Sequence, residues 1–261
     1  MQTHLLKSFV VIGSLLIAAA ASAPVRAQGN TDEKEKPPIY TYVAEWAAPR
    51  GDWPAIEKVD AAQKQLFEKL FADGTIIGYG RFRVVAHQEG QPTHGNWWTA
   101  TSMANLLKVL SAVSAQTGAS DLSKVFGESK HWDLILTSRQ YGIHSGTVEN
   151  GYLRVSTYTA KPGQGEMLTT AIKAYMVPIL DKLLADGAIH SYSIDREAVH
   201  SNDPNTVDVA IVTNDADGLD KFMAALESAG KANPLGGPAF ASATDGSLHR
   251  DFLAAASETS K

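Results

Sequence analysis

The sequence contains no cysteine among its 261 residues. Without thiols the chain can form no disulfide, carry no lipid on a cysteine side chain and perform no thiolate chemistry. Its stability must therefore come from packed apolar surface. The sequence also lacks a G-x-S-x-G nucleophile turn, an H-E-x-x-H zinc motif, a Walker phosphate loop and an acidic calcium loop. These absences argue against the classes of protein that depend on those motifs.

Basic residues are in slight deficit and are not concentrated in any segment. The formal net charge is −5 at pH 7, and residues of both signs are mixed along the chain. A surface that binds nucleic acid or an anionic membrane is expected to carry a basic cluster. We therefore expect no nucleic-acid partner, and this composition favours small molecules or proteins as partners.

Long apolar runs are lacking too, apart from one near the N-terminus. Lys7 precedes an apolar run of about a dozen residues, which is too short to span a bilayer and is typical of an export signal. Cleavage after Ala27 is favoured over cleavage after Ala23, because the latter would leave a proline at the new N-terminus. We expect residues 1–27 to be a signal peptide and residues 28–38 a disordered linker. The mature protein would then be periplasmic or secreted, with no membrane attachment.

The most informative feature that the sequence does have is an internal repeat. Residues 66–76 recur at residues 179–189 with an offset of 113, and the same offset continues through the next predicted strand and helix. Two copies of about a hundred residues indicate two packed lobes, because a solenoid needs at least about three shorter repeats. We place the first lobe at residues 39–145 and the second at residues 146–261.

Each lobe follows the order strand, helix, strand, strand, helix, strand. In the first lobe the predicted strands are 40–47, 75–87, 97–101 and 131–138, with one helix ending at Asp73 and one around 106–113. In the second lobe they are strands 152–160, 188–199, 207–213 and 248–256 and helices 166–186 and 218–229. Pro178 is expected to kink or interrupt its helix. Residues 232–246 are interpreted as a Gly- and Pro-rich stretch that contains an insertion.

This order of elements is that of the ferredoxin-like βαββαβ unit, an antiparallel sheet with both helices on one face. With its duplication, the chain resembles the dimeric α/β-barrel superfamily as a tandem fusion. The resemblance implies an α+β fold in which two ferredoxin-like repeats pack their sheets face to face as an intrachain barrel, so that the protein is a monomeric pseudo-dimer. The superfamily includes cofactor-independent monooxygenases, haem enzymes and proteins of unknown activity. It predicts architecture better than chemistry.

The strand period of two separates the residues of each strand into two faces. We assign the aliphatic positions, such as Val43, Leu134 and Val155, to the face beneath the helices. The opposite face, between the sheets, would then be aromatic and polar, as in a small-molecule pocket. The predicted ligand-binding residues are Tyr42, Trp46, Tyr79, Arg83, Arg154, Tyr158, His190, Tyr192 and Arg196. The alternative is a barrel filled by its own side chains.

A His-x-Asp pair in the last strand of each lobe is the sharpest candidate for chemistry. His131 with Asp133 recurs as His249 with Asp251. The spacing puts both side chains on one face of a strand, where a carboxylate can orient an imidazole that acts as a general base. We therefore predict these four residues as the catalytic set of an enzyme. The alternative is that the pairs make structural hydrogen bonds at the rim of the barrel.

Three functions remain open at this point. The first is an exported protein that binds a small molecule between the two sheets. The second is an enzyme, either a cofactor-independent monooxygenase or a haem-dependent one, for which His190 and His131 are the only candidate iron ligands that the resemblance offers. The third is a non-catalytic interaction module with a self-filled barrel. No metal site is predicted, and the identity of any cofactor is unknown.

Overall fold

The computed structural model describes residues 36–86, 89–117, 130–200 and 204–261. The predicted signal peptide and most of the predicted linker lie outside these ranges, so both stay predictions. No described helix is long and apolar enough to cross a membrane.

The described elements follow the order that the sequence predicts, with two halves. The first half contains β1 (Ile39–Ala47), α1 (Trp53–Ala72), β2 (Gly78–Val84), β3 (His94–Ala100), α2 (Met103–Thr117) and β4 (Lys130–Ile143). The second half contains β5 (Gly146–Thr159), α4 (Gly165–Ala171), the π-helical turn η2 (Ile172–Met176), α5 (Val177–Ala185), β6 (Ile189–Glu197), β7 (Thr206–Thr213), α6 (Ala216–Ala232), α7 (Gly236–Ala243) and β8 (Arg250–Ser260).

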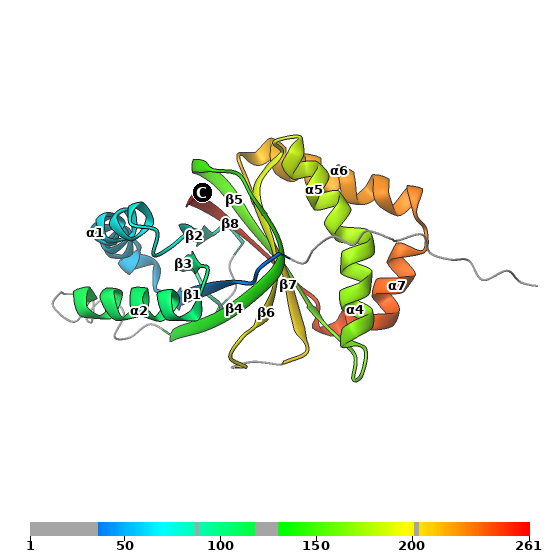
Figure 1. Ribbon diagram of the computed structural model, residues 1–261, viewed down its shortest axis with the longest axis horizontal. Helices are drawn as coiled ribbons and strands as arrows, with labels where there is room; N and C mark the ends of the chain where they lie inside the picture. The colour runs from blue at the N-terminus through cyan, green and yellow to red at the C-terminus, as the bar shows by residue number, and fades with distance from the viewer. Residues whose placement is uncertain (1–35, 87–88, 118–129, 201–203) are drawn as a thin grey trace, which may run out of the picture. The chain divides into compact units, whose positions relative to one another are not determined.

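The eight strands close into one barrel in the order β1-β3-β2-β8-β5-β7-β6-β4, and every pair of neighbours is antiparallel. Each half keeps the four-strand order of a ferredoxin-like sheet. The two sheets join edge to edge through the β2–β8 and β4–β6 ladders. Helices α1 and α2 lie beside the first sheet and α4 to α7 beside the second (Figure 1). The predicted fold class, an α+β barrel built from two repeats within one chain, is confirmed.

Strand β4 ties the two halves together because it is longer than predicted. The sequence pattern ended this strand at Ser138, but the strand continues to Ile143, and β5 begins at Gly146. The N-terminal part of β4 pairs with β1, and its C-terminal part pairs with β6. A β-bulge between Ser138 and Gln140 marks the change of partner. Only His144 and Ser145 lie between β4 and β5, so the two halves are joined by strand pairing as well as by the chain.

The first helix of the second lobe is interrupted, as Pro178 predicts. The helix divides into α4, the π-helical turn η2 and α5, and Pro178 is the second residue of α5. A proline has no N–H to donate to the carbonyl four residues earlier, so the regular hydrogen-bond pattern must change at this point. Helix α7 was not predicted, because Gly236, Gly237 and Pro238 read as a loop. They occupy its first turn, where the missing N–H of proline is harmless.

The prediction of which strand face lies in the barrel is wrong. Val43, Leu134 and Val155 line the barrel interior, whereas Tyr42 and Tyr79 pack under the helices of the first lobe. An eight-stranded barrel has an interior only wide enough for side chains of moderate size, whereas a sheet and its helices are about 10 Å apart. Aliphatic residues therefore fill the barrel, and most of the large aromatic rings fill the helix layers.

One indole lies inside the barrel, and a glycine makes room for it. Trp97 packs in the interior with Phe82, while its neighbour Trp98 is 1% exposed beneath the helices. A side chain at Gly80 would overlap the Trp97 ring and would place its Cβ 2.5 Å from the backbone oxygen of Ser257 in β8. Gly80 therefore allows Trp97 to lie inside the barrel next to the β2–β8 ladder.

We expect Gly80→Ala to lower the free energy of unfolding by about 1–3 kcal/mol, because the new methyl group overpacks the seam where Trp97 meets the β2–β8 ladder. Gly237→Ala is the matched control, since a Cβ there meets nothing within 4 Å. It should change stability by about 1 kcal/mol at most. Urea unfolding of both variants measures the difference. Equal effects would contradict this account of the seam.

Closure within one chain leaves no unpaired edge in the described sheet, so pairing of strands between chains is not available. We expect sedimentation velocity to give the mass of a monomer. A stable dimer at micromolar concentration would contradict the prediction that the two lobes of one chain replace the two subunits of a dimeric barrel.

Candidate functional site

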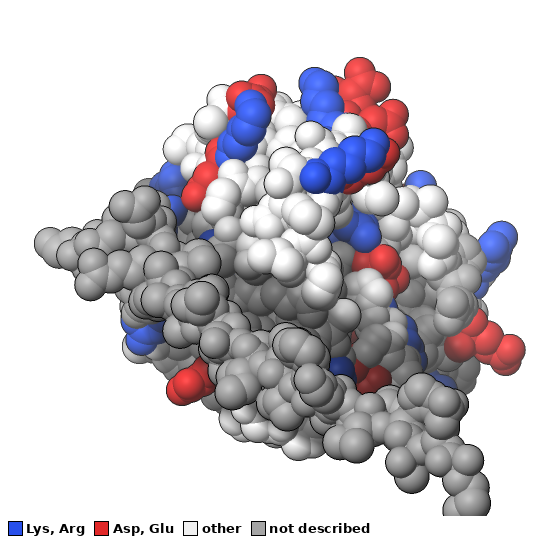
Figure 2. Space-filling model, turned by 90° about the vertical axis from the view of Figure 1, so that its right-hand side faces the viewer, with Lys and Arg blue, Asp and Glu red and all other residues white. Residues whose placement is uncertain are grey.

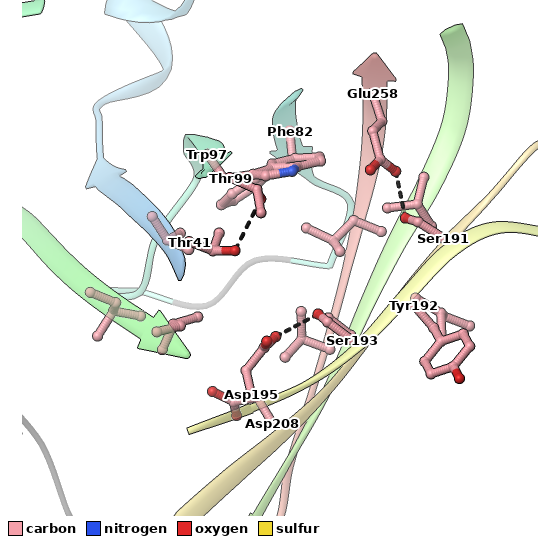
Figure 3. A pocket seen from close by; sticks show the side chains of 18 of the residues that line it. Thr41, Phe82, Trp97, Thr99, Ser191, Tyr192, Ser193, Asp195, Asp208 and Glu258 are labelled. Atoms are coloured by element: carbon pink, nitrogen blue, oxygen red, sulfur yellow. Dashed lines mark hydrogen bonds between the residues drawn. The ribbon is translucent and has the colours of Figure 1, made fainter. Parts of the chain in front are cut away.

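The barrel encloses a cavity of about 130 Å³ (Figure 3). This volume is close to that of an engineered protein cavity of about 150 Å³ that binds benzene. The cavity can therefore hold a ligand of about six non-hydrogen atoms. Most of its wall is apolar, and its larger aliphatic and aromatic side chains include Ile39, Val43, Phe82, Trp97, Leu134, Leu136, Ile143, Leu153, Val155, Ile211, Val212 and Phe252.

Four carboxylic acids from four strands interrupt this apolar wall. They are Glu45 of β1, Asp195 of β6, Asp208 of β7 and Glu258 of β8. Among the described residues that line the cavity, none is lysine, arginine or histidine. The interior therefore combines apolar surface with acidic groups that have no basic partner in the described wall.

Hydroxyl groups donate to three of the four acids. Asp195 accepts hydrogen bonds from the hydroxyls of Ser138 and Ser193. Ser191 donates to Glu258 over 2.6 Å (Figure 3), and Thr157 donates to Asp208 over 2.5 Å. A hydroxyl donor favours the charged form of an acid but brings no charge of its own. These hydrogen bonds orient the acids without neutralising them.

Burial makes all four acids hold their protons more tightly than in water. It raises the pKa of Glu45 to about 7, with a further rise from the charge of Asp208. Burial also raises the pKa of Glu258 to about 7 and that of Asp195 to about 6, against the opposing effect of their hydroxyl donors. The pKa of Asp208 is raised for the same reason. Near neutral pH the cavity can therefore gain or lose protons, or accept a cation.

The predicted catalytic pair of the first lobe lies outside the barrel. Nε2 of His131 is 3.1 Å from an oxygen of Asp133, and the imidazole stacks on Trp46 with the ring centres 5.2 Å apart. Asp133 also interacts with Tyr42: burial raises the pKa of the tyrosine hydroxyl, and its hydrogen bond to Asp133 adds to the rise. Tyr42 in turn stacks on Trp98.

The second lobe repeats this arrangement with a different donor. Tyr158 stacks on His249 at 4.7 Å, and Nε2 of His249 is 3.6 Å from Asp251. The position of Tyr42 is taken by Arg154, whose guanidinium donates to Asp251 over 2.9 Å. Ser156 donates to the same oxygen over 2.7 Å. Both His-Asp pairs are brought together as predicted, but on the outer side of the sheet, where neither lines the barrel cavity. Their catalytic role stays a prediction.

The remaining predicted ligand-binding residues also lack a direct place in the cavity. Tyr79 packs on Phe67 of α1, Arg83 lies 3.7 Å from Glu57 of α1, and the hydroxyl of Tyr192 donates to Asp181 of α5. Tyr192 is among the residues that border the cavity, but its ring points away from the cavity (Figure 3).

Two further predicted residues lie at the ends of β6. Nε2 of buried His190 is 2.9 Å from the hydroxyl of Ser260, next to a bulge in β6. At the other end of the strand, Arg196 donates to Thr169 of α4.

Sequence reasoning missed the four acids, although a signal for them exists. Asp208 interrupts the otherwise aliphatic run from Val207 to Val212, and Glu258 follows Ala254 and Ala256 on the same face of β8. An acid at a buried position of a strand is unusual unless it has a partner or a function. This signal is visible only once the inward face is assigned correctly.

The described residues contain no cluster of metal-binding side chains. Within the described ranges, no group of three or more metal-binding side chains could hold an ion. Neither of the two histidines considered as iron ligands lines the barrel cavity. His190 is buried against Ser260, and His131 is stacked on Trp46.

Comparisons with known proteins support the architecture. No protein-family model matches the sequence, and no curated protein matches it. Among solved structures, a protein named as a putative monooxygenase from Lactobacillus acidophilus is similar over 86% of this chain and 97% of its own, with a TM-score of 0.61 and 12% identity. One with the same description from Fusobacterium nucleatum covers 85% and 93%, with a TM-score of 0.53 and 9% identity.

A third solved structure, named as a putative chlorite dismutase, covers 84% of this chain and 94% of its own, with a TM-score of 0.50 and 11% identity. At such identities these likenesses establish the fold alone. The chain therefore has the dimeric α/β-barrel fold, with both halves in one polypeptide.

The raised pKa values predict how stability depends on pH. Because the interior acids bind protons more tightly in the folded than in the unfolded protein, their contribution to the free energy of unfolding falls as pH rises from about 4.5 to about 7.5. Glu258→Gln cannot ionise, so it should become more stable relative to the wild type as pH rises. Urea unfolding at both ends of this pH range measures the gap, which is the difference in free energy of unfolding between the variant and the wild type. Glu68→Gln, an exposed change in α1, is the control and should show a constant gap. A constant gap for Glu258→Gln would contradict the assignment.

Proposed function

We propose that the protein is a small-molecule binding protein whose barrel cavity takes a small organic cation, namely an amine with an apolar body of about five carbon atoms. The observation that carries this proposal is the cavity wall, in which Glu45, Asp195, Asp208 and Glu258 interrupt an apolar surface that has no basic residue among its described members. An ammonium group would meet the acids, and its hydrocarbon part would contact the aliphatic side chains.

Electrostatics favours a cation over a neutral ligand of equal size. An ion pair inside the barrel is screened less than one at the surface. The four acids keep raised pKa values because no positive charge compensates them. A bound ammonium group would lower those values and release protons. Ligand binding and proton release are therefore expected to be coupled.

The size of the cavity sets the upper limit of the ligand. At about 130 Å³ it is below the roughly 300–1,000 Å³ of drug-sized sites. A cyclic amine with five carbon atoms matches this volume. The alternative of a self-filled barrel predicts that no such ligand enters, and the monooxygenase alternative predicts a larger organic substrate. A titration with a small amine therefore separates the proposed site from both alternatives.

The test is isothermal titration calorimetry of the purified protein with cyclopentylamine and, as the neutral match, cyclopentanol. The amine should bind at neutral pH at least about tenfold more tightly than the alcohol, because it gains a charge-assisted hydrogen bond. Glu45→Gln and Glu258→Gln should each weaken amine binding by about tenfold, while Glu68→Gln should leave it unchanged.

Two outcomes would overturn the proposal. Equal affinity for amine and alcohol would mean that the acids do not select charge. No amine binding at concentrations of about 10 mM would favour a barrel filled by its own side chains, since even a weak site for a small ligand has a dissociation constant near 1 mM.

A further inference from the structure

A second cleft lies outside the barrel, in the first lobe, between α1 and the outer faces of β2, β3, β5 and β8. It has an inner pocket of about 50 Å³ and an outer part of about 410 Å³. The two parts adjoin, because both are lined by Asp60, Arg81, Glu149 and Ser257. The inner pocket is about a third of the volume of a benzene-sized cavity, so it has room for two or three non-hydrogen atoms.

Two buried amides line the inner pocket. They are Gln63 of α1 and Asn96 of β3, and each is 5% exposed. Nδ2 of Asn96 donates to Oε1 of Gln63 over 3.4 Å, but Oδ1 of Asn96 accepts no hydrogen bond from the described residues. A buried oxygen without a donor is costly and needs an explanation. The inner pocket therefore presents an acceptor to any ligand that brings a donor.

The second lobe shows that the fold does not need polar side chains at these strand positions. The offset of 113 relates Asn96 to Val209 and Arg81 to Ile194. The ladders agree with this correspondence, because Asn96 pairs with Arg81 in one lobe and Val209 pairs with Ile194 in the other. Val209 and Ile194 both belong to the apolar core of the second lobe. Equivalent backbone positions are thus filled there by apolar side chains.

The helix position that faces Asn96 follows the same rule. The offset relates Gln63 to Met176, the last residue of the π-helical turn, and both side chains are buried. Burial of an amide costs free energy that an aliphatic side chain in the same place avoids. Departures of this kind from a well-packed core are expected at functional sites. The two amides of the first lobe are therefore better explained by a ligand than by the fold.

The acids and cations on the outer face of the cleft balance one another. Its acids are Glu57, Asp60 and Glu149, and its lysine and arginine residues are Lys64, Arg81 and Arg83. Glu258 also borders the inner pocket, but its carboxyl accepts from Ser191 inside the barrel (Figure 3). Equal numbers of acids and cations favour a neutral ligand over an ion.

These charges are not consumed by close ion pairs. On the helices of the second lobe opposite charges meet directly, as Lys231 and Glu227 do at 2.6 Å, and that side of the molecule shows basic and acidic side chains next to one another (Figure 2). In the cleft, Arg83 and Glu57 are 3.7 Å apart, and no ion pair joins Asp60 to a residue in the described ranges.

Asp60 and Arg81 offer complementary groups to a hydroxyl. Burial raises the pKa of Asp60 to about 7; the charge of Arg81 opposes this rise and that of Glu57 adds to it. Arg81 donates through Nε to Ser257 over 3.3 Å, and its guanidinium has further N–H groups. A hydroxyl group can donate to the carboxylate and accept from the guanidinium at the same time.

We propose that this cleft binds a neutral polyhydroxylated molecule of the size of a hexose. Its hydroxyls would donate to Asn96 and Asp60 and accept from Arg81. A hydroxymethyl group has two non-hydrogen atoms and fits the inner pocket, while the ring would lie in the outer part beside Tyr152 and Ala255. The proposal does not depend on the cation site in the barrel, because the two sites lie on opposite faces of the sheet.

The test is isothermal titration calorimetry of the purified protein with D-glucose, D-galactose and D-mannose. The matched compound is hydroxymethyl-tetrahydropyran, which keeps the ring and the hydroxymethyl group but lacks the ring hydroxyls. At least one hexose should bind at least about tenfold more tightly than this match, because its ring hydroxyls add hydrogen bonds. D-glucosamine and D-glucuronate should gain less than about tenfold over glucose, since the charges of the cleft balance.

Variants of the wall locate the site. Asp60→Ala and Arg81→Ala should each weaken hexose binding by about tenfold, because each removes a charged hydrogen-bond partner. Glu68→Ala, an exposed change in the same helix as Asp60, should leave it unchanged.

A double variant separates binding from a structural role. Gln63→Met with Asn96→Val gives the first lobe the residues of the second. It should weaken hexose binding by more than about tenfold without lowering the urea midpoint, because replacing both partners of a buried hydrogen bond by apolar groups is nearly neutral for stability.

Four results would overturn the proposal. They are no hexose binding at about 10 mM, where even a weak site with a dissociation constant near 1 mM is filled, equal affinity for the hexoses and the match, a gain of more than about tenfold for a charged sugar, and undiminished binding in the double variant. Glu45→Gln should weaken amine binding but leave hexose binding unchanged, so a failure of the cation site and a failure of this site are read separately.

Discussion

Closure of the barrel is the constraint on which the rest of the structure depends. The β2–β8 and β4–β6 ladders join two ferredoxin-like sheets into one ring, so each strand has a neighbour on both sides. Eight strands enclose a space only wide enough for side chains of moderate size. The interior therefore takes mostly aliphatic residues, and one indole enters only where Gly80 leaves room. Most large aromatic rings pack between the sheet and the helices.

Closure of the barrel also determines how the charged forms of the inward-facing acids can be stabilised. A carboxylate that points into the barrel is separated from water, so its charged form must be stabilised by hydrogen bonds, by a proton or by a cation. Ser138, Thr157 and Ser191 supply the hydrogen bonds, and none of them supplies charge. A barrel built only for stability would place aliphatic residues at these positions, as it does at Val43 and Leu134. Packing alone does not account for these four acids, and this is the ground on which the cation site is proposed.

The order of the elements could be predicted from the sequence because duplication repeats the same signal twice. Which face of each strand points into the barrel could not be predicted from the sequence. Periodicity separates two faces but does not say which is inward, and an error of one residue exchanges them completely. We expected aromatic residues such as Tyr42 to face a cavity between the sheets, whereas Tyr42 packs under the helices. Because the inward face was assigned wrongly, Asp208 and Glu258 could not be recognised as interior acids. The same error therefore hid the candidate site.

The His-x-Asp motif makes equivalent contacts in the two lobes. In both lobes the histidine stacks on an aromatic residue of the neighbouring strand, and the aspartate accepts a hydrogen bond from that strand. The donor is the phenol of Tyr42 in one lobe and the guanidinium of Arg154 in the other. A contact that ties the last strand to the first tolerates either donor. The constant part of the motif therefore fits the alternative of a structural link between strands, while its catalytic role stays a prediction.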